Sequence, residues 1–287
     1  MRKAEIGIIG GSGFYQMDGL EDIEEVRIDT PFGSPSDSII LGTLEGRRLA
    51  FLARHGRGHK YLPSEVPFRA NIYAMKTLGV ERIISVSAVG SLKEEIKPLD
   101  MVLPDYFFDF TKKRESTFFG NGIAAHVSFS EPICPVMKDA IFKAAREESV
   151  DVKKGGTYVC IEGPQFSTRA ESEFFRKMEF DVIGMTNATE AKLAREAEIC
   201  YVTLAMVTDY DCWHEEEEEV SVELVVENLN KNIEAAKKVI KRALRYIPVE
   251  RKDCGCANAL ENAIITARDR IPEEAKERLK LIIGRYL

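Results

Sequence analysis

One stretch decides the fold class of this chain: Ile199-Cys-Tyr-Val-Thr-Leu-Ala-Met-Val-Thr-Asp-Tyr-Asp-Cys-Trp213. It is an apolar run, rich in β-branched residues, that ends at the two carboxylates Asp209 and Asp211. Such a run is typical of a strand buried on both faces inside a parallel sheet. Ligands of open α/β sheets bind beyond the carboxyl ends of these strands, so we expect a ligand site at the two aspartates. If the chain stays extended through Asp211, both side chains project to the same side.

The pair of carboxylates is open to several interpretations. A metal site is not supported, because no further acid or histidine with ligand spacing surrounds the pair, and His214 alone completes no site. A glycosidase pair needs carboxyl groups several ångströms apart across a sugar bond, which neighbours on one strand provide only awkwardly. A ligand with two adjacent nitrogens fits better, and adenine carries N7 and N6 on one edge. A solvated strand end is the remaining alternative.

Length and composition indicate a globular protein of one domain. Of the 287 residues, 45% are hydrophobic and 30% are charged, which suits one large α/β domain. The net charge of -7 argues against a nucleic-acid-binding surface. The amino terminus has no signal-peptide pattern, and no apolar run approaches membrane-spanning length. We expect a cytoplasmic domain over residues 1–287 with no membrane or nucleic-acid partner. Two closing helices are expected from about 257 to 287, one over roughly 257–269 and one over roughly 273–286.

The cysteine pattern leaves two interpretations open. The chain contains six cysteines, namely Cys134, Cys160, Cys200, Cys212, Cys254 and Cys256. The pairing Cys254-Gly-Cys256 is unusual for a cytoplasmic chain, but no second Cys or His pair follows, so the spacing does not support zinc. Disulfide bonds inside cells do occur in hyperthermophiles, and the dense opposite charges over 273–280 indicate a thermophile. Disulfide bonds and free thiols therefore both remain open.

Two loops near the amino terminus carry residues that suit an anion. Gly10-Gly-Ser-Gly13 follows an apolar strand, but it lacks the third glycine of the dinucleotide-binding fingerprint, and no helical pattern follows. A dinucleotide site is excluded there, whereas the backbone N–H groups and the Ser12 hydroxyl still suit a phosphate. Two strands over 38–44 and 48–53, joined by a turn at Glu45-Gly46, then lead to Arg54-His-Gly-Arg-Gly-His59, where arginine offers a bidentate fork to a dianion. A solvated surface is the alternative for both loops.

Strand and helix patterns alternate along the rest of the chain. The expected elements are a helix over 63–78, a strand over 82–87 with a small-residue loop over 87–91, a helix over 135–148, a strand over 157–161, a helix over 169–178, a strand over 181–184, and helices over 190–197 and 221–246. The aromatic stretch over 104–119 is more typical of an insertion or an intersubunit contact. The alternation predicts a single α/β domain with a central mixed, mostly parallel twisted sheet flanked by helices.

Six motifs occur in the order Gly10-Gly-Ser-Gly13, Arg54-His-Gly56, Ser87-Ala-Val-Gly90, Glu162-Gly-Pro-Gln-Phe166, Met185-Thr186 and Val207-Thr-Asp-Tyr-Asp-Cys-Trp213. Together they resemble the 5'-methylthioadenosine phosphorylases of the trimeric purine nucleoside phosphorylase family. The resemblance covers residues 5 to about 245 and implies a pentosyltransferase with a nucleoside phosphorylase-like fold. One departure is Gly184, which stands where some members carry Asn.

The resemblance implies a role for each motif. The residues implied to bind phosphate are Ser12, Arg54, His55, Ser87, Ala88 and Thr186. The residues implied to bind the nucleoside are Phe166 on the purine face, Met185 on the ribose, Asp209 at N7, Asp211 at the 6-amino group, and Val222, Val225 and Val226 around the 5'-methylthio group. His126 would come from a neighbouring subunit of a homotrimer or a dimer of trimers.

The implied reaction is phosphorolysis of 5'-methylthioadenosine to adenine and 5-methylthioribose 1-phosphate. Breaking the N-glycosidic bond leaves electron density on the purine, so Asp209 would act as the general acid at N7. Inorganic phosphate would attack C1' as co-substrate, with no cofactor and no metal, because Arg54 and backbone dipoles can neutralise it. The alternative is a broad-specificity purine nucleoside phosphorylase that accepts adenosine, inosine and guanosine.

Overall fold

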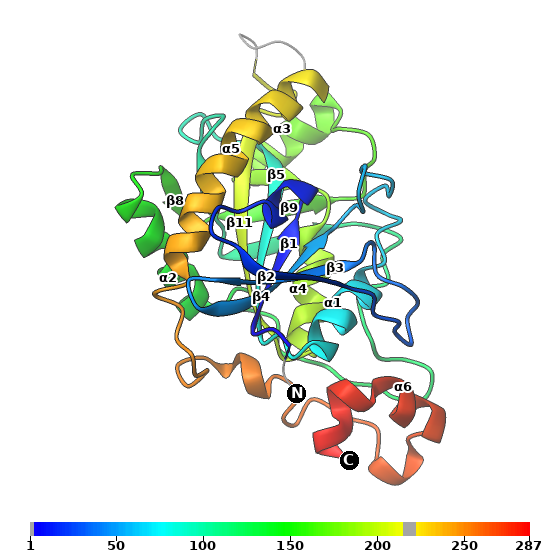
Figure 1. Cartoon of the computed structure of the whole chain (residues 1–287). Coiled ribbons are helices and arrows are strands. Elements are labelled where there is room, and N and C mark those ends of the chain that lie inside the picture. The colour runs from blue at the N-terminus through cyan, green and yellow to red at the C-terminus, as the bar shows by residue number, and fades with distance from the viewer. Residues whose placement is uncertain (1–2, 215–221) are drawn as a thin grey trace.

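Strand β11 (Cys200–Asp209) is buried along its whole length, as its apolar sequence predicts. The structure is a computed structural model that describes residues 3–214 and 222–287. In it, β11 lies beside the long helix α5 (Val222–Ala243; Figure 1). It pairs in parallel with β5 (Arg82–Ser91) on one edge and antiparallel with β6 (Met101–Leu103) on the other. The prediction that this strand lies inside a parallel sheet is therefore correct for its pairing with β5 and wrong for its pairing with β6.

The described residues form strands and helices in alternation. The other strands are β1 (Ile6–Gly10), β2 (Glu21–Val26), β3 (Ile39–Leu44), β4 (Arg47–Ala53), β7 (Tyr106–Phe110), β8 (Val152–Lys154), β9 (Thr157–Ile161) and β10 (Val182–Gly184). The other α-helices are α1 (Phe68–Thr77), α2 (Pro135–Glu147), α3 (Arg169–Lys177), α4 (Asn187–Glu196) and α6 (Glu273–Ile283). Short 3-10 helices are η1 (Ser12–Tyr15), η2 (Gly255–Asn258), η3 (Arg268–Arg270) and η4 (Gly284–Tyr286).

All described strands belong to one mixed sheet. Its continuous path runs β2-β3-β4-β1-β5-β10-β9-β7, and β11, β6 and β8 branch from β5. Six of the ten strand pairings are parallel, including those of β1 with β4, β1 with β5, and β5 with β11. The predicted class, a single α/β domain with a mixed and mostly parallel sheet, is confirmed.

Helices cover the sheet from two sides (Figure 1). Helix α5 packs on β11 and on α2, whereas α4 packs on α1 and on the other side of β11 and β5. The core between these layers is apolar and includes Ile6, Ile8, Phe51, Ile84 and Leu204, all at most 1% exposed. None of the described helices is long and apolar enough to cross a membrane.

Two local predictions near the amino terminus have different outcomes. Glu45 and Gly46 both adopt positive φ and join β3 to β4 as the expected tight turn. The helix expected over 63–78 begins only at Phe68. The reason is Pro67, which has no N–H and disfavours the helical conformation of the residue before it.

Two segments expected to be irregular are strands. The small-residue loop predicted over 87–91 is the end of β5, because β11 pairs with β5 as far as Gly90. Part of the aromatic stretch forms β7, which is parallel to β9 at the edge of the sheet. Sheet pairing therefore overrides the weak strand propensity of the small residues and the irregular appearance of the aromatic ones.

The first of the two expected closing helices is wrong. Residues 257–269 form part of η2, a series of turns and the start of η3, and Asn262 adopts a φ of +66° that an α-helix does not allow. An antiparallel bridge between Ala125 and Ile264 attaches this segment to the rest of the protein. The second helix, α6, is present and starts at the predicted residue Glu273.

Candidate active site

The carboxyl ends of β1, β4 and β5 meet at one edge of the sheet, where β1 lies between the other two. Gly10, the last residue of β1, lies beside Ala53, the last residue of β4. The backbone N–H of Arg54 donates to the oxygen of Gly10 at 2.9 Å. The segments that carry Ser12, Arg54 and Ser87 therefore meet at this edge. The structure describes only the backbone of Ser12, at the start of η1.

Arg54 is buried and is held entirely by protein groups at this edge. Its Nε donates to Oε1 of Glu190 at 2.5 Å, and its Nη2 donates to Oε2 at 3.1 Å. Nη1 donates to the carbonyl of Val86 at 2.9 Å, and Nη2 donates to Oγ of Ser85 at 2.7 Å. Although burial opposes the charge, the Glu190 carboxylate raises the pKa of Arg54. The charge of Arg54 is thus already balanced by a carboxylate that the sequence analysis did not single out.

The start of α4 is tied to the same edge through Asn187. Its Nδ2 lies 3.0 Å from Oγ of Ser85, 3.1 Å from the hydroxyl of Tyr201 and 3.0 Å from Oγ1 of Thr203. Thr186 precedes the helix, and its hydroxyl donates to Oδ1 of Asn187 at 3.0 Å. These contacts hold Thr186 beside β5, where a phosphate-binding residue is predicted.

Ser87 and Ala88 lie next to this group of contacts on β5. Ser87 is buried, and its hydroxyl lies next to the hydroxyl of Tyr158. A serine hydroxyl can donate one hydrogen bond and accept two, so Ser87 can still contact a ligand group at the end of β5. Ala88 is the residue of β5 that is not fully buried, which leaves an opening at this point of the strand.

His55 is a neutral member of the cluster. Its Nδ1 lies 2.8 Å from the carbonyl oxygen of Tyr61, and because a carbonyl can only accept, Nδ1 carries the proton. Burial, assisted by the charge of Arg54, lowers the pKa of His55 to about 4. At neutral pH its Nε2 is therefore an acceptor, which suits a protonated oxygen of a phosphate but does not neutralise a charge.

Asp209 ends β11 beside a bulge. The register of β11 against β5 shifts between Val207 and Asp209, which places Asp209 opposite Gly90. A β-bulge redirects the side chain that follows it. A Cβ atom added to Gly90 would lie 2.9 Å from Oδ1 of Asp209 and 3.3 Å from Cβ of Asp211. Only glycine at position 90 leaves room for both acids at this edge.

Asp211 does not continue the strand, so the expected extended backbone is wrong. Its φ is +55°, and its backbone N–H donates to Oδ1 of Asp209 at 2.8 Å, which keeps the two carboxylates adjacent. The carboxyl group of Asp211 is buried beside the hydroxyls of Ser172 and Ser167. Burial raises the pKa of Asp211, and the nearby hydroxyls of Ser172 and Ser167 oppose this change. A carboxyl group has more acceptor positions than these contacts use, so Asp211 can still accept a hydrogen bond from a ligand.

The loop of Phe166 lies between the two halves of the candidate site. A Cβ atom on Gly163 would lie 2.5 Å from Sδ of Met185, so this loop packs directly on Met185. At its other end, the thiol of Cys212 donates to the carbonyl of Ser167 at 3.3 Å. The ring of Phe166 is 47% exposed. It is therefore free to cover a planar ligand next to the carboxylates.

The first turns of α5 lie against the end of β11. Nδ2 of Asn228 donates to the carbonyl of Thr208 at 2.8 Å, and Nδ2 of Asn232 donates to the carbonyl of Val207 at 2.9 Å. This places the half-buried Val225 and the exposed Val226 close to the carboxylates. The side chain of Val222 lies outside the described part. The sequence analysis missed both asparagines, although two amides four residues apart on an apolar helix face were a signal.

Gly184, the departure from the family pattern, has a structural explanation. A Cβ atom at this position would lie 1.9 Å from the hydroxyl oxygen of Tyr158. The hydroxyl of Tyr158 in turn lies 3.3 Å from Oδ1 of Asn187. Tyr158 occupies the space into which a side chain at position 184 would point, so glycine is required here.

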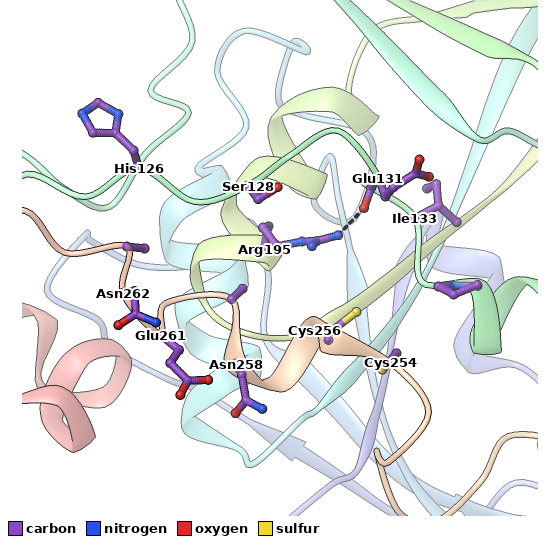
Figure 2. A pocket seen from close by; sticks show the side chains of 14 residues that line it. His126, Ser128, Glu131, Ile133, Arg195, Cys254, Cys256, Asn258, Glu261 and Asn262 are labelled. Atoms are coloured by element: carbon purple, nitrogen blue, oxygen red, sulfur yellow. Dashed lines mark hydrogen bonds between the residues drawn. The ribbon is translucent and has the colours of Figure 1, made fainter.

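His126 lies in a different part of the subunit. Its backbone N–H donates to the carbonyl of Ala263 at 2.9 Å. Figure 2 shows it on the wall of a cavity of about 520 Å³, across from Cys254 and Cys256. These cysteines lie close to Cys200 at the beginning of β11, whereas Asp209 lies at its end. The chain therefore does not bring its own His126 to its own carboxylates.

All six cysteines are free thiols in the structure. The Sγ atoms of Cys200 and Cys254 are 3.6 Å apart, far beyond the S–S bond length of about 2 Å. The structure thus does not contain the disulfide bonds that the sequence analysis left open.

A family model described as "Phosphorylase superfamily" matches residues 5–245. The chain belongs to this superfamily. It is 61% identical over 284 residues to S-methyl-5'-thioadenosine phosphorylase of Koribacter versatilis. The alignment covers 99% of this chain and 97% of the relative. The corresponding protein of Geobacter sulfurreducens is 56% identical and covers 98% and 99%.

Among solved structures, a methylthioadenosine phosphorylase from an Antarctic soil metagenomic library is 54% identical to this chain, with a TM-score of 0.93 and coverage of 98% and 99%. The predictions of family, fold and enzyme class, a pentosyltransferase of the nucleoside phosphorylase type, are confirmed by this membership and these similarities.

Proposed function

We propose that the enzyme catalyses phosphorolysis of 5'-methylthioadenosine, releasing adenine and 5-methylthioribose 1-phosphate. The names of its relatives support the substrate. The observation that carries the proposal is the adjacency of two buried carboxylates, in which the backbone N–H of Asp211 donates to Oδ1 of Asp209 at 2.8 Å. Two adjacent carboxylates match the N7 and N6 edge of adenine, where protonated N7 and the 6-amino group both donate hydrogen bonds. A 6-oxopurine has no donor at position 6 to satisfy Asp211.

The carboxylates have different roles in the proposed mechanism. Asp209 delivers a proton to N7 as the N-glycosidic bond breaks, which stabilises the leaving purine. Asp211 accepts a hydrogen bond from the 6-amino group and so selects the base. Both side chains are less than 10% exposed, and an interior of low dielectric strengthens their effect on the charge that develops in the transition state.

Phosphate is proposed to bind where β1, β4 and β5 end, with Ser12, Arg54, His55, Ser87, Ala88 and Thr186 as its contacts. The position of the Ser87 hydroxyl near the carboxyl end of β5 supports this placement. Because Glu190 already balances Arg54, the phosphate charge has to be met mainly by hydroxyl and backbone N–H donors, and His55 accepts from a protonated phosphate oxygen. The reaction as proposed uses inorganic phosphate as co-substrate and needs no cofactor and no metal.

The rest of the nucleoside is assigned to Met185 on the ribose, Phe166 on the purine face, and Val222, Val225 and Val226 around the 5'-methylthio group. The nearness of Val225 to the end of β11 supports the last assignment. His126 lies far from the carboxylates of its own chain, which agrees with its delivery from a neighbouring subunit.

A homotrimer or a dimer of trimers is therefore part of the proposal. The edge strand β7 exposes Tyr106, Phe108 and Phe110 by 38% to 46%. An exposed aromatic row on a sheet edge is typical of a surface that another protein chain covers. The cytoplasmic location and the thermophilic source rest on composition and stay predictions.

The function is tested by release of free base from 5'-methylthioadenosine, adenosine and inosine, each with and without phosphate. We expect phosphate-dependent release from the two adenine nucleosides, with kcat/KM for inosine at least about 100-fold lower, because its oxo group leaves Asp211 unsatisfied. Equal kcat/KM for inosine and adenosine contradicts the role of Asp211. Release of base without phosphate contradicts phosphorolysis.

A further inference from the structure

Four cysteines from three distant segments meet at the end of the sheet opposite the active site. Cys134 directly precedes α2, Cys200 is the first residue of β11, and Cys254 and Cys256 flank the start of η2. Their Sγ atoms all lie within 4.8 Å of one another, and three of the four side chains are buried. Figure 2 shows Cys254 and Cys256 next to each other on their segment.

The sulfur spacing is that of a metal site. Four thiolates around one zinc ion, each at about 2.3 Å, form a tetrahedron whose edges are about 3.8 Å long. The Sγ atoms of Cys200 and Cys254 are 3.6 Å apart. We propose that Cys134, Cys200, Cys254 and Cys256 bind one Zn²⁺ ion as four thiolates.

The site is structural, not catalytic. Four protein ligands leave no open position for water or substrate, which is the arrangement of structural zinc sites. Cys200 and Asp209 stand at opposite ends of β11, a separation of about 30 Å at about 3.3 Å per residue. The ion connects the segment that follows α5 to the beginning of β11 and to α2, so it stabilises the attachment of the carboxyl-terminal part.

Cationic side chains compensate the charge of the site. Four thiolates and one Zn²⁺ carry a net charge of -2. Arg82 lines a small cavity together with Cys134, Cys200 and Cys254, and Arg195 lines the cavity shared by Cys254 and Cys256. Nη1 of Arg82 is buried, lies 3.6 Å from the Glu81 carboxylate, and makes no hydrogen bond within the described residues. It is available to a thiolate, and such contacts from outside the ligand set stabilise metal sites.

The site also explains why the sequence pattern did not indicate zinc. Zinc motifs are recognised by two pairs of ligands with short spacings. Here one pair, Cys254-Gly-Cys256, is local, and the other two ligands are single cysteines that the pairing of β11 and the start of α2 bring together. The backbone N–H of Cys134 donates to the carbonyl of Tyr201 at 2.8 Å, so these two ligands are positioned by the fold itself.

The test uses the full chain, expressed with zinc in the medium and purified anaerobically without chelator. Elemental analysis is expected to give about one zinc per chain. Cobalt added to the zinc-depleted wild-type protein is expected to give the strong thiolate-to-metal absorption and the visible bands of a tetrahedral four-thiolate site. This second measurement needs no variant, so it decides the question even if a variant fails to fold.

Two variants make the assignment specific. Cys254→Ala is expected to lose most of the zinc and the four-thiolate cobalt spectrum, whereas Cys160→Ala removes a buried thiol outside the cluster and is expected to keep both. The proposal is overturned if the wild-type protein contains no zinc and gives no four-thiolate cobalt spectrum. Thiol titration of the unfolded chain then distinguishes six free thiols from a smaller number, which would mean that disulfide bonds have formed instead.

Discussion

The backbone N–H of Asp211 donates to Oδ1 of Asp209 at 2.8 Å, so the two acids form one local unit although the strand ends between them. The hydroxyl of Thr208 donates to the other oxygen, Oδ2, of Asp209 at 2.7 Å. Asp211 in contrast lies beside the hydroxyls of Ser172 and Ser167. The two carboxylates are therefore distinguishable by substitution, even though they are neighbours.

We expect Asp209→Asn to lower kcat/KM for 5'-methylthioadenosine by about 100-fold or more, because an amide cannot transfer a proton to N7. Asp211→Asn is expected to act mainly on selectivity: the amide donates to a 6-oxo group, so the preference for adenosine over inosine falls by about 10-fold or more. Steady-state kinetics with both nucleosides measure the two effects. Wild-type turnover by Asp209→Asn would show that another group is the acid.

Gly90 offers a test of the geometry that needs no change of an acid. We expect Gly90→Ala to lower kcat/KM by roughly 10- to 100-fold, because its Cβ would lie 2.9 Å from Oδ1 of Asp209 and displace that carboxylate. The matched control is Gly284→Ala, where a Cβ meets no atom within 4 Å of the described part. Equal kinetics of the two variants would contradict the placement of Asp209 against Gly90.

The ion pair of Arg54 and Glu190 is expected to be a major determinant of stability. Both side chains are at most 4% exposed, and removing one partner leaves the other charge buried and unpaired. We predict that Glu190→Gln lowers the free energy of unfolding by about 3–5 kcal/mol, measured by urea denaturation.

Two further variants identify the cause of that loss. Glu273→Gln removes one partner of the solvent-exposed pair with Lys276 and is expected to change stability by less than about 1 kcal/mol. The double variant Arg54→Met, Glu190→Gln removes the unpaired charge and is expected to regain part of the lost stability. A double variant less stable than Glu190→Gln would show that the guanidinium hydrogen bonds, not the charge, are decisive.

The fold and the meeting of the motif-bearing strand ends at one edge of the sheet could be predicted from the sequence because their signals are local. An unbroken apolar run specifies β11, and glycine-rich or polar motifs mark the strand ends. The acid that neutralises Arg54 could not be predicted, because Glu190 is distant in the chain and sits in a helix like any other acid. The bulge before Asp209 depends on the register between two strands, which no single segment specifies.

The cysteines also show that local sequence does not reveal which distant residues meet in the fold. A local pair was visible as Cys254-Gly-Cys256, but its relation to Cys134 and Cys200 depends on where a strand and a helix begin in space. His126 is a further case, because no local pattern shows that the chain folds it onto the cavity lined by Cys254 and Cys256. Sequence patterns thus specify elements and loops, while the partners of buried polar groups require the tertiary structure.

Glu196 predicts a pH dependence of stability that is independent of catalysis. Burial raises the pKa of Glu196 from 4.5 to about 7, against the opposing hydrogen bonds that its carboxyl group accepts from the backbone of Phe118 and the hydroxyl of Thr117. Because the folded pKa lies above the unfolded one, the fold prefers the protonated group. This contribution is fully present below pH 4.5 and is lost as the pH rises through about 7.

The size of the effect follows from the pKa change: relative to pH 4.5, the wild type is expected to lose roughly 3 kcal/mol at pH 8 through this one group. Glu196→Gln cannot ionise and keeps an acceptor for the N–H of Phe118, so it should not show this loss. Taking the difference in unfolding free energy between the two proteins at each pH removes the titration of all other groups. The difference should favour the variant increasingly between pH 5 and pH 8, and a constant difference across this range would contradict a raised pKa at Glu196.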